Sequence, residues 1–188
     1  GYFRRLDAVT QKMTQKEVRF FFRETDAVSF EALACNKVGL KDVSLAKVKT
    51  FLNETGTSLK VSKANVAMVL SSLGSLDKNK INNAGVLMFA SNVDKVIPHS
   101  ESILGAFKGT NKTHIFDRKD VRDDLLTQFN EAVAFLKKHL NIRSEIRGVN
   151  RYDIYEIPLD ALREAVVNAI VHRDYTIKGT SVYVTVSY

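Results

Sequence analysis

The sequence predicts an α+β protein, because the chain contains both stretches with a helical pattern and stretches with a strand-like pattern. Two stretches, about residues 119–140 and 159–171, carry apolar residues at the three-to-four-residue spacing of packed helices. Two others, 142–154 and 182–187, alternate apolar and polar residues as strands do. We therefore expect a helical module followed by helices packed on a sheet.

Length and composition are those of a globular protein. The 188 residues are 45% hydrophobic and 26% charged, and a chain of this size buries a substantial core. No apolar run approaches the roughly 20 residues of a membrane span, and no signal peptide opens the chain. A single cysteine, Cys35, excludes an internal disulfide, so we expect a cytoplasmic protein without a membrane partner. Gly1 is not a natural start, which predicts a fragment.

Positive charge is concentrated in the first half of the chain. Residues 1–80 contain 14 Lys or Arg and 8 Asp or Glu, a balance of +6, whereas residues 81–188 contain 14 and 13, a balance of +1. The basic half is typical of proteins that bind a polyanion such as DNA. The alternative is that the lysines only solvate helix faces.

The first 24 residues predict a strand, a turn and a helix. Tyr2–Arg5 reads as a strand and Asp7–Gln11 as a polar turn. Thr14 and Glu17 form a capping box that begins a helix. We expect Phe20–Phe22 in this helix to belong to a core; the alternative is an exposed platform on which bases stack.

Residues 44–90 have the element order of a winged helix-turn-helix. Ser44 begins one helix, which ends near Gly56, and Ser62 begins another, which ends at Gly74. A turn at residues 78–80 and an apolar strand over Val86–Phe89 follow, so the order is helix, helix, hairpin.

The charges of this module suit phosphate groups better than bases. The second helix offers no arginine to grip guanine edges. Lysines around it, and arginines near the N-terminus, are the candidate nucleic-acid contacts: Arg4, Arg5, Lys60, Lys63, Lys78 and Lys80. A purely structural connector is the alternative.

The next stretch predicts strand, helix and hairpin. Residues 102–110 read as a strand, and a long helix is expected from about Lys119 to Leu140. Four acidic residues crowd its start: Asp117, Asp120, Asp123 and Asp124. They complement the helix dipole, and a divalent-metal site is the alternative. Residues 142–154 follow as a hairpin.

The helix predicted after Pro158 carries a polar row through an otherwise apolar sequence. Asp160, Glu164, Asn168 and His172 recur every four residues and therefore lie along one line of the helix. A helix apolar nearly all round is usually buried, so we expect the row to face a pocket or a polar partner. Glu164 would be a general base one turn from Asn168, whose oxygen could help hold hydrated Mg²⁺. A structural seam is the alternative.

A resemblance adds to this reading. Residues 163–175, REAVVNAIVHRDY, resemble the N-box helix of GHKL-type (Bergerat-fold) ATPases, in the divergent form found in Schlafen/AlbA-related transcriptional regulators. Upstream segments are similar to that family in the same order. Gly1–Arg5 resembles the last strand of the AlbA-like domain, Leu73–Leu76 with Ile81–Phe89 resembles "LGLL…LTNAGxLLF", and Phe107–Thr110 with His114–Arg118 resembles "FKGT…HILDR".

The resemblance implies a domain organisation. Residues 1–40 would be the tail of an AlbA-like DNA-binding domain, 41–90 a winged-helix-like module, and 91–188 the first half of a divergent Bergerat-like α/β sandwich. A working ATPase of this kind also needs later glycine-containing motifs, so we expect no hydrolysis by this chain alone.

The resemblance also implies roles for residues near the N-box. With ATP and Mg²⁺ as cofactors, Glu164 would be the catalytic base or water-orienting residue and Asn168 the metal-side ligand. Arg173 would contact phosphate, and His172 and Asp174 would brace the loop beside it.

The function that we expect is that of a DNA-binding transcriptional regulator whose C-terminal domain responds to nucleotide. An ATP-hydrolysing or nucleic-acid-processing enzyme, with motifs outside this chain, and a dimerisation scaffold are the alternatives. Four scattered histidines and one cysteine do not make a usual zinc site. The sequence contains neither a Walker A loop nor a G-x-S-x-G motif.

Overall fold

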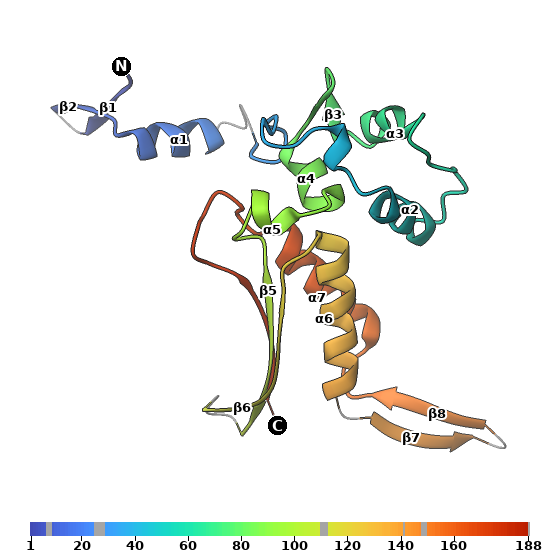
Figure 1. Ribbon diagram of the computed structural model, residues 1–188. Helices are drawn as coiled ribbons and strands as arrows, with labels where there is room; N and C mark the ends of the chain where they lie inside the picture. Colours follow the sequence, from blue (N-terminus) through green and yellow to red (C-terminus); the bar gives the residue numbers. More distant parts are fainter. Residues whose placement is uncertain (7–8, 25–28, 110–112, 141, 148–149, 188) are drawn as a thin grey trace.

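The computed structural model describes the backbone of residues 1–6, 9–24, 29–109, 113–140, 142–147 and 150–187. It confirms the predicted α+β class, because the helices of the described residues accompany small sheets that are antiparallel or mixed (Figure 1). We distinguish an N-terminal arm (residues 1–24), a helical unit (29–97) and a sandwich unit (100–187). No helix in the described part of the chain is long and apolar enough to cross a bilayer.

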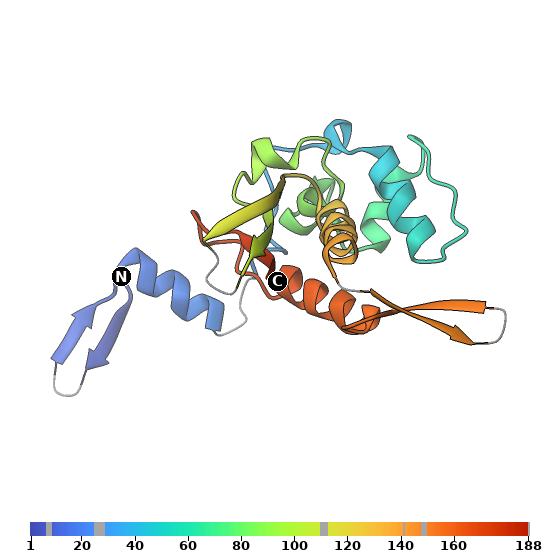
Figure 2. The ribbon, with the colours of Figure 1, turned by 90° about the horizontal axis from the view of Figure 1, so that it is seen from below.

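The N-terminal arm is a hairpin and one helix that project away from the rest of the molecule (Figures 1 and 2). Strand β1 (Phe3–Leu6) pairs antiparallel with β2 (Val9–Lys12), and α1 spans Gln15–Glu24. The strand predicted at the start of the chain is confirmed. The turn predicted up to Gln11 is wrong from Val9 onwards, because the chain already pairs back on β1 there; Asp7 lies outside the described residues.

The capping box at the start of α1 is confirmed, whereas its aromatic run is not a core. Thr14 N donates to Glu17 Oε2 at 2.8 Å, and Glu17 N donates to Thr14 Oγ1 at 3.3 Å. Phe20 and Phe21 are 59% and 51% exposed, because the arm stands apart from both hydrophobic cores. The side chain of Phe22 is not among those described.

The helical unit encloses the first hydrophobic core. Val48, Leu70 and Phe89 lie at its centre and are almost fully buried. As predicted, Ser44 caps a helix, and its side chain accepts a hydrogen bond from Lys47 N. The elements are a 3₁₀ helix (Leu40–Asp42), α2 (Leu45–Glu54), α3 (Val66–Ser72), β3 (Leu76–Asp77), β4 (Lys80–Ile81), α4 (Asn83–Phe89) and α5 (Val93–Val96).

Two predictions for this unit are wrong. The strand expected over Val86–Phe89 is helix α4, because the side chain of Asn82 caps it by accepting from Gly85 N at 2.9 Å. An apolar run of this length fits a buried helix as well as a strand. Ser62 opens a turn before α3 rather than capping it, and the helix begins at Val66. The order helix, helix, hairpin is present, with β3 and β4 as the hairpin.

The sandwich unit packs two helices on one face of a three-stranded sheet (Figure 1). Strand β5 (Ser102–Lys108) lies in the middle, antiparallel to β6 (His114–Val121) and parallel to β9 (Val182–Ser187). The second core fills the space between this sheet and the helices, around Leu104 and Ala106. The strand expected over 182–187 is confirmed, and the strand expected over 102–110 is confirmed as far as Lys108; residue 110 lies outside the described residues.

The long helix of this unit starts later than predicted. Helix α6 spans Leu125–His139, whereas Lys119 and Val121 belong to β6. Asp124 caps the helix and accepts a hydrogen bond from Thr127 N at 2.9 Å, which fixes its first turn. The predicted hairpin is present as β7 (Ile142–Arg147) and β8 (Asn150–Tyr155), and it extends away from the sandwich (Figure 2).

Helix α7 (Leu159–Val171) follows Pro158 as predicted, but the prediction that it is buried nearly all round is wrong. Val166 and Ile170 are buried, whereas Val167 and Val171 are 38% and 64% exposed. One face of α7 packs on the sheet beside α6, and its other faces are open.

Candidate functional site

The polar row of α7 lies on its exposed side. Glu164 and Asn168 touch one another, and Asn168 Nδ2 donates to Glu164 Oε1 at 3.0 Å. Asp160 and His172 are exposed as well. The row is therefore accessible to a ligand from solvent and does not face a closed pocket.

Arg173, in the loop after α7, holds its guanidinium group among several partners. Its Nη2 donates to the carbonyl oxygen of Thr180 at 2.5 Å. The guanidinium carbon lies 4.9 Å from the centre of the Tyr175 ring, in a cation–π contact. Nε and Nη1 are buried and make no hydrogen bond to a residue that the structure describes. Two buried N–H groups in this position are candidate donors to an anion.

The rest of this loop is held tightly. Asp174 Oδ1 accepts from Thr176 N at 2.9 Å and from Thr176 Oγ1 at 2.7 Å. Tyr175 is 3% exposed and belongs to the first core, and its hydroxyl donates to Ile170 O at 2.9 Å. Burial raises the pKa of Tyr175 to about 12. The Tyr175 ring thus anchors this loop to the helical unit. The backbone carbonyl oxygen of Tyr175 also lies 2.7 Å from His99 Nε2.

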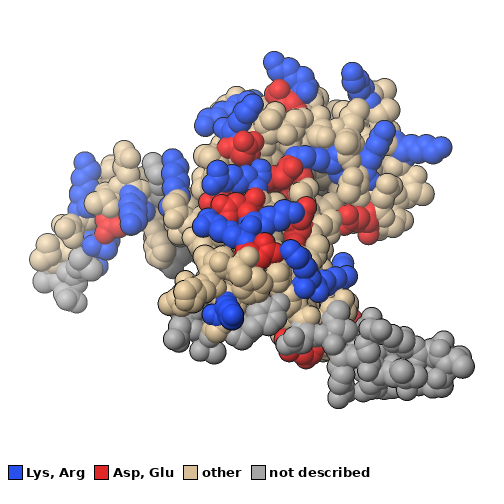
Figure 3. Space-filling view, turned by 60° about the horizontal axis from the view of Figure 1, so that its bottom comes forward, with Lys and Arg blue, Asp and Glu red and all other residues tan. Residues whose placement is uncertain are grey.

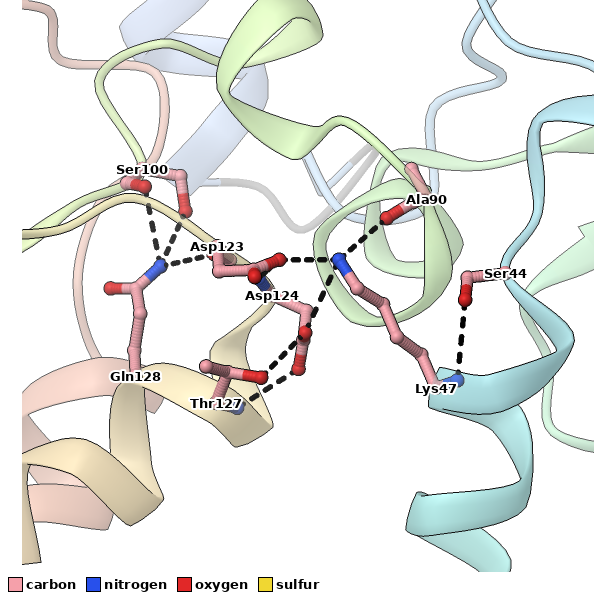
Figure 4. A network of polar contacts seen from close by, with 8 residues as sticks. All are labelled: Ser44, Lys47, Ala90, Ser100, Asp123, Asp124, Thr127 and Gln128. Carbon is pink, nitrogen blue, oxygen red and sulfur yellow. Dashed lines mark hydrogen bonds and ion pairs between the residues drawn. The ribbon is translucent and has the colours of Figure 1, made fainter.

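A polar network joins the helical unit to the sandwich unit (Figure 4). Lys47 extends from α2, and its Nζ donates to Ala90 O at 2.9 Å and to Asp123. The same ammonium lies 3.3 Å from Asp124 Oδ2. Burial alone would raise the pKa of Asp123, but hydrogen bonds from Lys47 and from the Asp124 backbone hold it below its usual value.

Gln128 extends this network into the sandwich unit. It is 1% exposed, and its Nε2 donates to Asp123 O at 2.7 Å and to Ser100 O at 3.2 Å. Its Oε1 accepts from Ser102 Oγ at 2.7 Å. Every polar atom of this buried amide is therefore engaged, which fixes the start of α6 against the start of β5.

The prediction that four aspartates complement the dipole at the start of the long helix is wrong for Asp117 and Asp120, because both lie in β6; each is paired with a basic side chain. Asp120 accepts from Arg118 at 2.8 Å, and Asp117 accepts from both Lys138 and His139 at 2.7 Å. These hydrogen bonds hold the pKa values of both carboxyl groups below the usual range. Within the described ranges, no group of three or more His, Cys, Asp or Glu is placed to hold a metal ion.

The four candidate lysines of the helical unit are exposed: Lys60, Lys63, Lys78 and Lys80. Lys60 and Lys63 precede α3, and Lys78 and Lys80 belong to the hairpin that follows it. None of the four forms an ion pair with a residue that the structure describes. Their charges are therefore available to a polyanion.

Four cations of the sandwich unit differ from these lysines, because carboxylates neutralise them. Arg118, Lys119, Arg122 and Lys138 each pair with an acidic residue. Over the middle of the face that Figure 3 draws, basic and acidic side chains lie among one another. In the arm, Arg4 pairs with Glu17 at 2.8 Å, and Arg5 is exposed.

The structure does not bring the predicted residues into one site. The loop with Arg173 follows the polar row of α7 directly, whereas the free lysines surround α3 in the other unit. A shallow hollow lies elsewhere, between β6 and α6, and no α7 residue lines it. Sequence reasoning missed Lys47 and Gln128. Asp123 and Asp124 precede an apolar run, which is a sequence signal for a helix cap. No sequence pattern indicated that Lys47, 76 residues before Asp123, would be their partner.

No protein-family model matches the chain, and the comparison with curated proteins finds no match. Among solved structures, the crystal structure of the DIP2311 protein from Corynebacterium diphtheriae is similar, with a TM-score of 0.65 and 19% sequence identity. The similar region covers 99% of this chain and 36% of that chain. At this level of identity the similarity shows the fold alone.

Proposed function

We propose that this chain is the DNA-binding and nucleotide-responsive part of a cytoplasmic transcriptional regulator of the Schlafen/AlbA-related type. The observation that carries DNA binding is the contrast between the two units. The four lysines around α3 form no ion pair with a described residue, whereas four cations of the sandwich unit, Arg118, Lys119, Arg122 and Lys138, pair with carboxylates. Unpaired lysines contribute to binding a polyanion because they lose no existing ion pair.

The chemistry of α3 favours contacts with the phosphate backbone. Its exposed side includes Met68 and Ser71, which offer little discrimination between base edges. Lys60 and Lys63 before the helix, and the lysines of the hairpin after it, reach outward as point charges suited to phosphate oxygens. We therefore propose binding that depends strongly on salt and weakly on sequence.

Replacing Lys60, Lys63, Lys78 and Lys80 together by Gln is expected to weaken binding of a labelled DNA duplex in fluorescence anisotropy. Each lost phosphate contact removes about 0.9 from the slope of log affinity against log salt, so the slope should fall by about 3 to 4. A matched control changes Lys119, Lys137, Lys138 and Lys178 to Gln, which removes the same charge from the sandwich unit. Equal losses in both variants would contradict the proposal, because binding would then follow net charge alone.

A second observation favours the nucleotide response. Arg173 has two buried N–H groups without a described acceptor, and the exposed Glu164–Asn168 pair lies on the helix that precedes its loop. These donors and acceptors fit a phosphate group with its metal ion. Mg²⁺ is usually held by one or two carboxylates together with substrate phosphates and water, so one carboxylate and one amide suit a nucleotide-borne ion and not a metal held by protein alone.

Within this proposal each residue has one task. Glu164 would orient or deprotonate a water molecule, and Asn168 would contact the metal ion through its side-chain oxygen. Arg173 would donate to a phosphate oxygen, while Asp174 and His172 hold the loop in place. Bound Mg²⁺ would supply positive charge that offsets the charge of the phosphates.

Asn168→Ala is expected to weaken Mg-ATP binding at least about tenfold in calorimetry, since the loss of a metal-side ligand and its hydrogen bond costs about 1.4 kcal/mol or more. Asn53→Ala, at an exposed position of α2, is the matched control and should bind as the unmodified chain does. Titration with Mg²⁺ alone should give no binding. Absence of nucleotide binding by the folded, unmodified chain would contradict the nucleotide response and leave the DNA proposal intact.

A further inference from the structure

The β3–β4 hairpin has a buried base and an exposed tip. Leu76 and Ile81 pair across the ladder at the base and are 7% and 1% exposed, as members of the first core. The carbonyl oxygen of Ile81 also accepts a hydrogen bond from Cys35 N at 2.7 Å. The tip, residues 77–80, is exposed and projects outward from the helical unit (Figure 1). The core therefore holds the tip in a fixed position.

The turn at this tip uses residues that local stability does not favour. Asp77 pairs with Lys80, so Lys78 and Asn79 alone form the turn. Their φ angles are +46° and +64°, and a type I′ turn requires positive values at both of these positions. Glycine and asparagine adopt such values readily, whereas lysine does so rarely. Residues in such conformations cluster at functional sites, which indicates that the tip side chains serve a contact outside the hairpin.

The fold uses the neighbouring asparagine amides and leaves that of Asn79 at the surface. Asn65, Asn82 and Asn83 each donate to a backbone carbonyl oxygen, at 2.9, 2.7 and 2.9 Å. Asn79 is exposed, and its amide makes no hydrogen bond within the part of the chain that the structure describes. Its donors are therefore available to a ligand at the tip of the hairpin.

We propose that this tip enters the minor groove of A·T-rich DNA. In that groove an A·T pair presents only acceptors, adenine N3 and thymine O2, to which the Asn79 amide donates. A G·C pair adds the guanine amino group, a donor that opposes the N–H groups of the amide. Narrow A·T-rich minor grooves also carry an enhanced negative potential, which attracts the Lys78 ammonium group. The inference rests on the proposed DNA binding and adds a preference for base composition to it.

The minor groove fits this hairpin better than the major groove does. Strands β3 and β4 have two residues each, which is too short for a ribbon that lies along the major groove. The minor groove is about 6 Å wide and admits the side chains of a two-residue turn. The hairpin therefore reads base edges with its tip, while the lysines before α3 contact phosphate groups.

Fluorescence anisotropy with three labelled duplexes tests the proposal on the unmodified chain. The duplexes share their length and flanks and differ in a central block of A·T, G·C or inosine·C pairs. Inosine lacks the amino group of guanine, so an inosine·C pair combines an A·T-like minor groove with the major groove of G·C. The A·T and inosine·C duplexes should each bind about fivefold more tightly than the G·C duplex, the lower end of the discrimination that one base contact carries.

Asn79→Gly separates the base contact from the fold. Glycine adopts a positive φ without strain, so the turn is kept while the amide is removed. This variant should bind all three duplexes equally. Lys63→Gln is the matched control: it should weaken binding to all three by the same factor and keep the preference, because a phosphate contact carries no sequence information.

Three results would each overturn the inference and leave DNA binding itself intact. They are equal binding of the three duplexes by the unmodified chain, binding of the inosine·C duplex as weak as that of G·C, and a preference that survives in Asn79→Gly. A folded, unmodified chain that binds none of the duplexes would overturn the inference together with the DNA proposal.

Discussion

Replacing Lys47 by Met is expected to lower the free energy of unfolding by about 3 kcal/mol, because it leaves a buried carboxylate without its cation. The Asp124 side chain is 3% exposed and depends on Lys47 for an opposite charge at 3.3 Å. Met keeps the length and apolar stem of lysine, so the packing changes little. Urea denaturation followed by circular dichroism measures the effect.

Lys49→Met is the matched control, since Lys49 lies on the same helix and is exposed. Surface changes of this kind are usually within about 0.5 kcal/mol of neutral. A loss at Lys47 no larger than the loss at Lys49 would show that the network in Figure 4 does not hold the two units together.

The pH dependence of this effect has a definite sign. Lys47 lowers the pKa of Asp123 in the folded chain, so as the pH falls the unfolded chain takes up the proton first. The stability contributed by the Lys47–Asp123 pair is therefore fully present above the pKa that Asp123 has in the unfolded chain. It is lost as the pH falls through the lower pKa that Asp123 has in the folded chain. The difference between Lys47→Met and the unmodified chain should accordingly shrink in acid.

Several local signals, although not the cap expected at Ser62, were readable from sequence because each depends on neighbours within one turn. The Thr14–Glu17 capping box, the Ser44 cap and the stop at Gly74, which has a φ of +67°, are all present in the structure. Such interactions involve residues three or four apart, so spacing alone determines them.

Features that depend on distant partners could not be read in this way. The run NAGVLMF is a helix in this fold because Asn82 caps it and both sides of it are buried, and its pattern fits a buried strand equally well. Helix α6 begins at Leu125 and not at Lys119 as predicted, because the residues up to Val121 pair with β5 and form β6. Tertiary contacts decide both cases.

The candidate site shows the same division. The four-residue spacing of Glu164 and Asn168 correctly placed them on one line of a helix, where they now form a hydrogen bond. The side of α7 that packs on the sheet could not be deduced from sequence, because the helix carries apolar residues on nearly all of its sides. In the structure only Val166 and Ile170 of this helix are buried. Which face is covered depends on α6 and β9.

Gly85→Ala is the clearest case in which tertiary packing reverses the sign that local propensity predicts. In the interior of an ordinary helix this change stabilises by about 1 kcal/mol. In α4 the added Cβ would lie 2.6 Å from Ser75 O and 2.9 Å from Ile81 Cγ2. The first of these is a backbone atom that also accepts a hydrogen bond from Asn82 N, so it cannot move aside without breaking that bond.

We therefore expect Gly85→Ala to lower the free energy of unfolding by about 3 kcal/mol, at the upper end of the overpacking range. Gly39→Ala is the matched control, because the nearest atom to its added Cβ is the flexible Asp42 Oδ2 at 3.9 Å. Urea denaturation of both variants gives the comparison. Stabilisation by Gly85→Ala would mean that α4 does not pack against the backbone of Ser75, and the first core would then need a different arrangement around the β3–β4 hairpin.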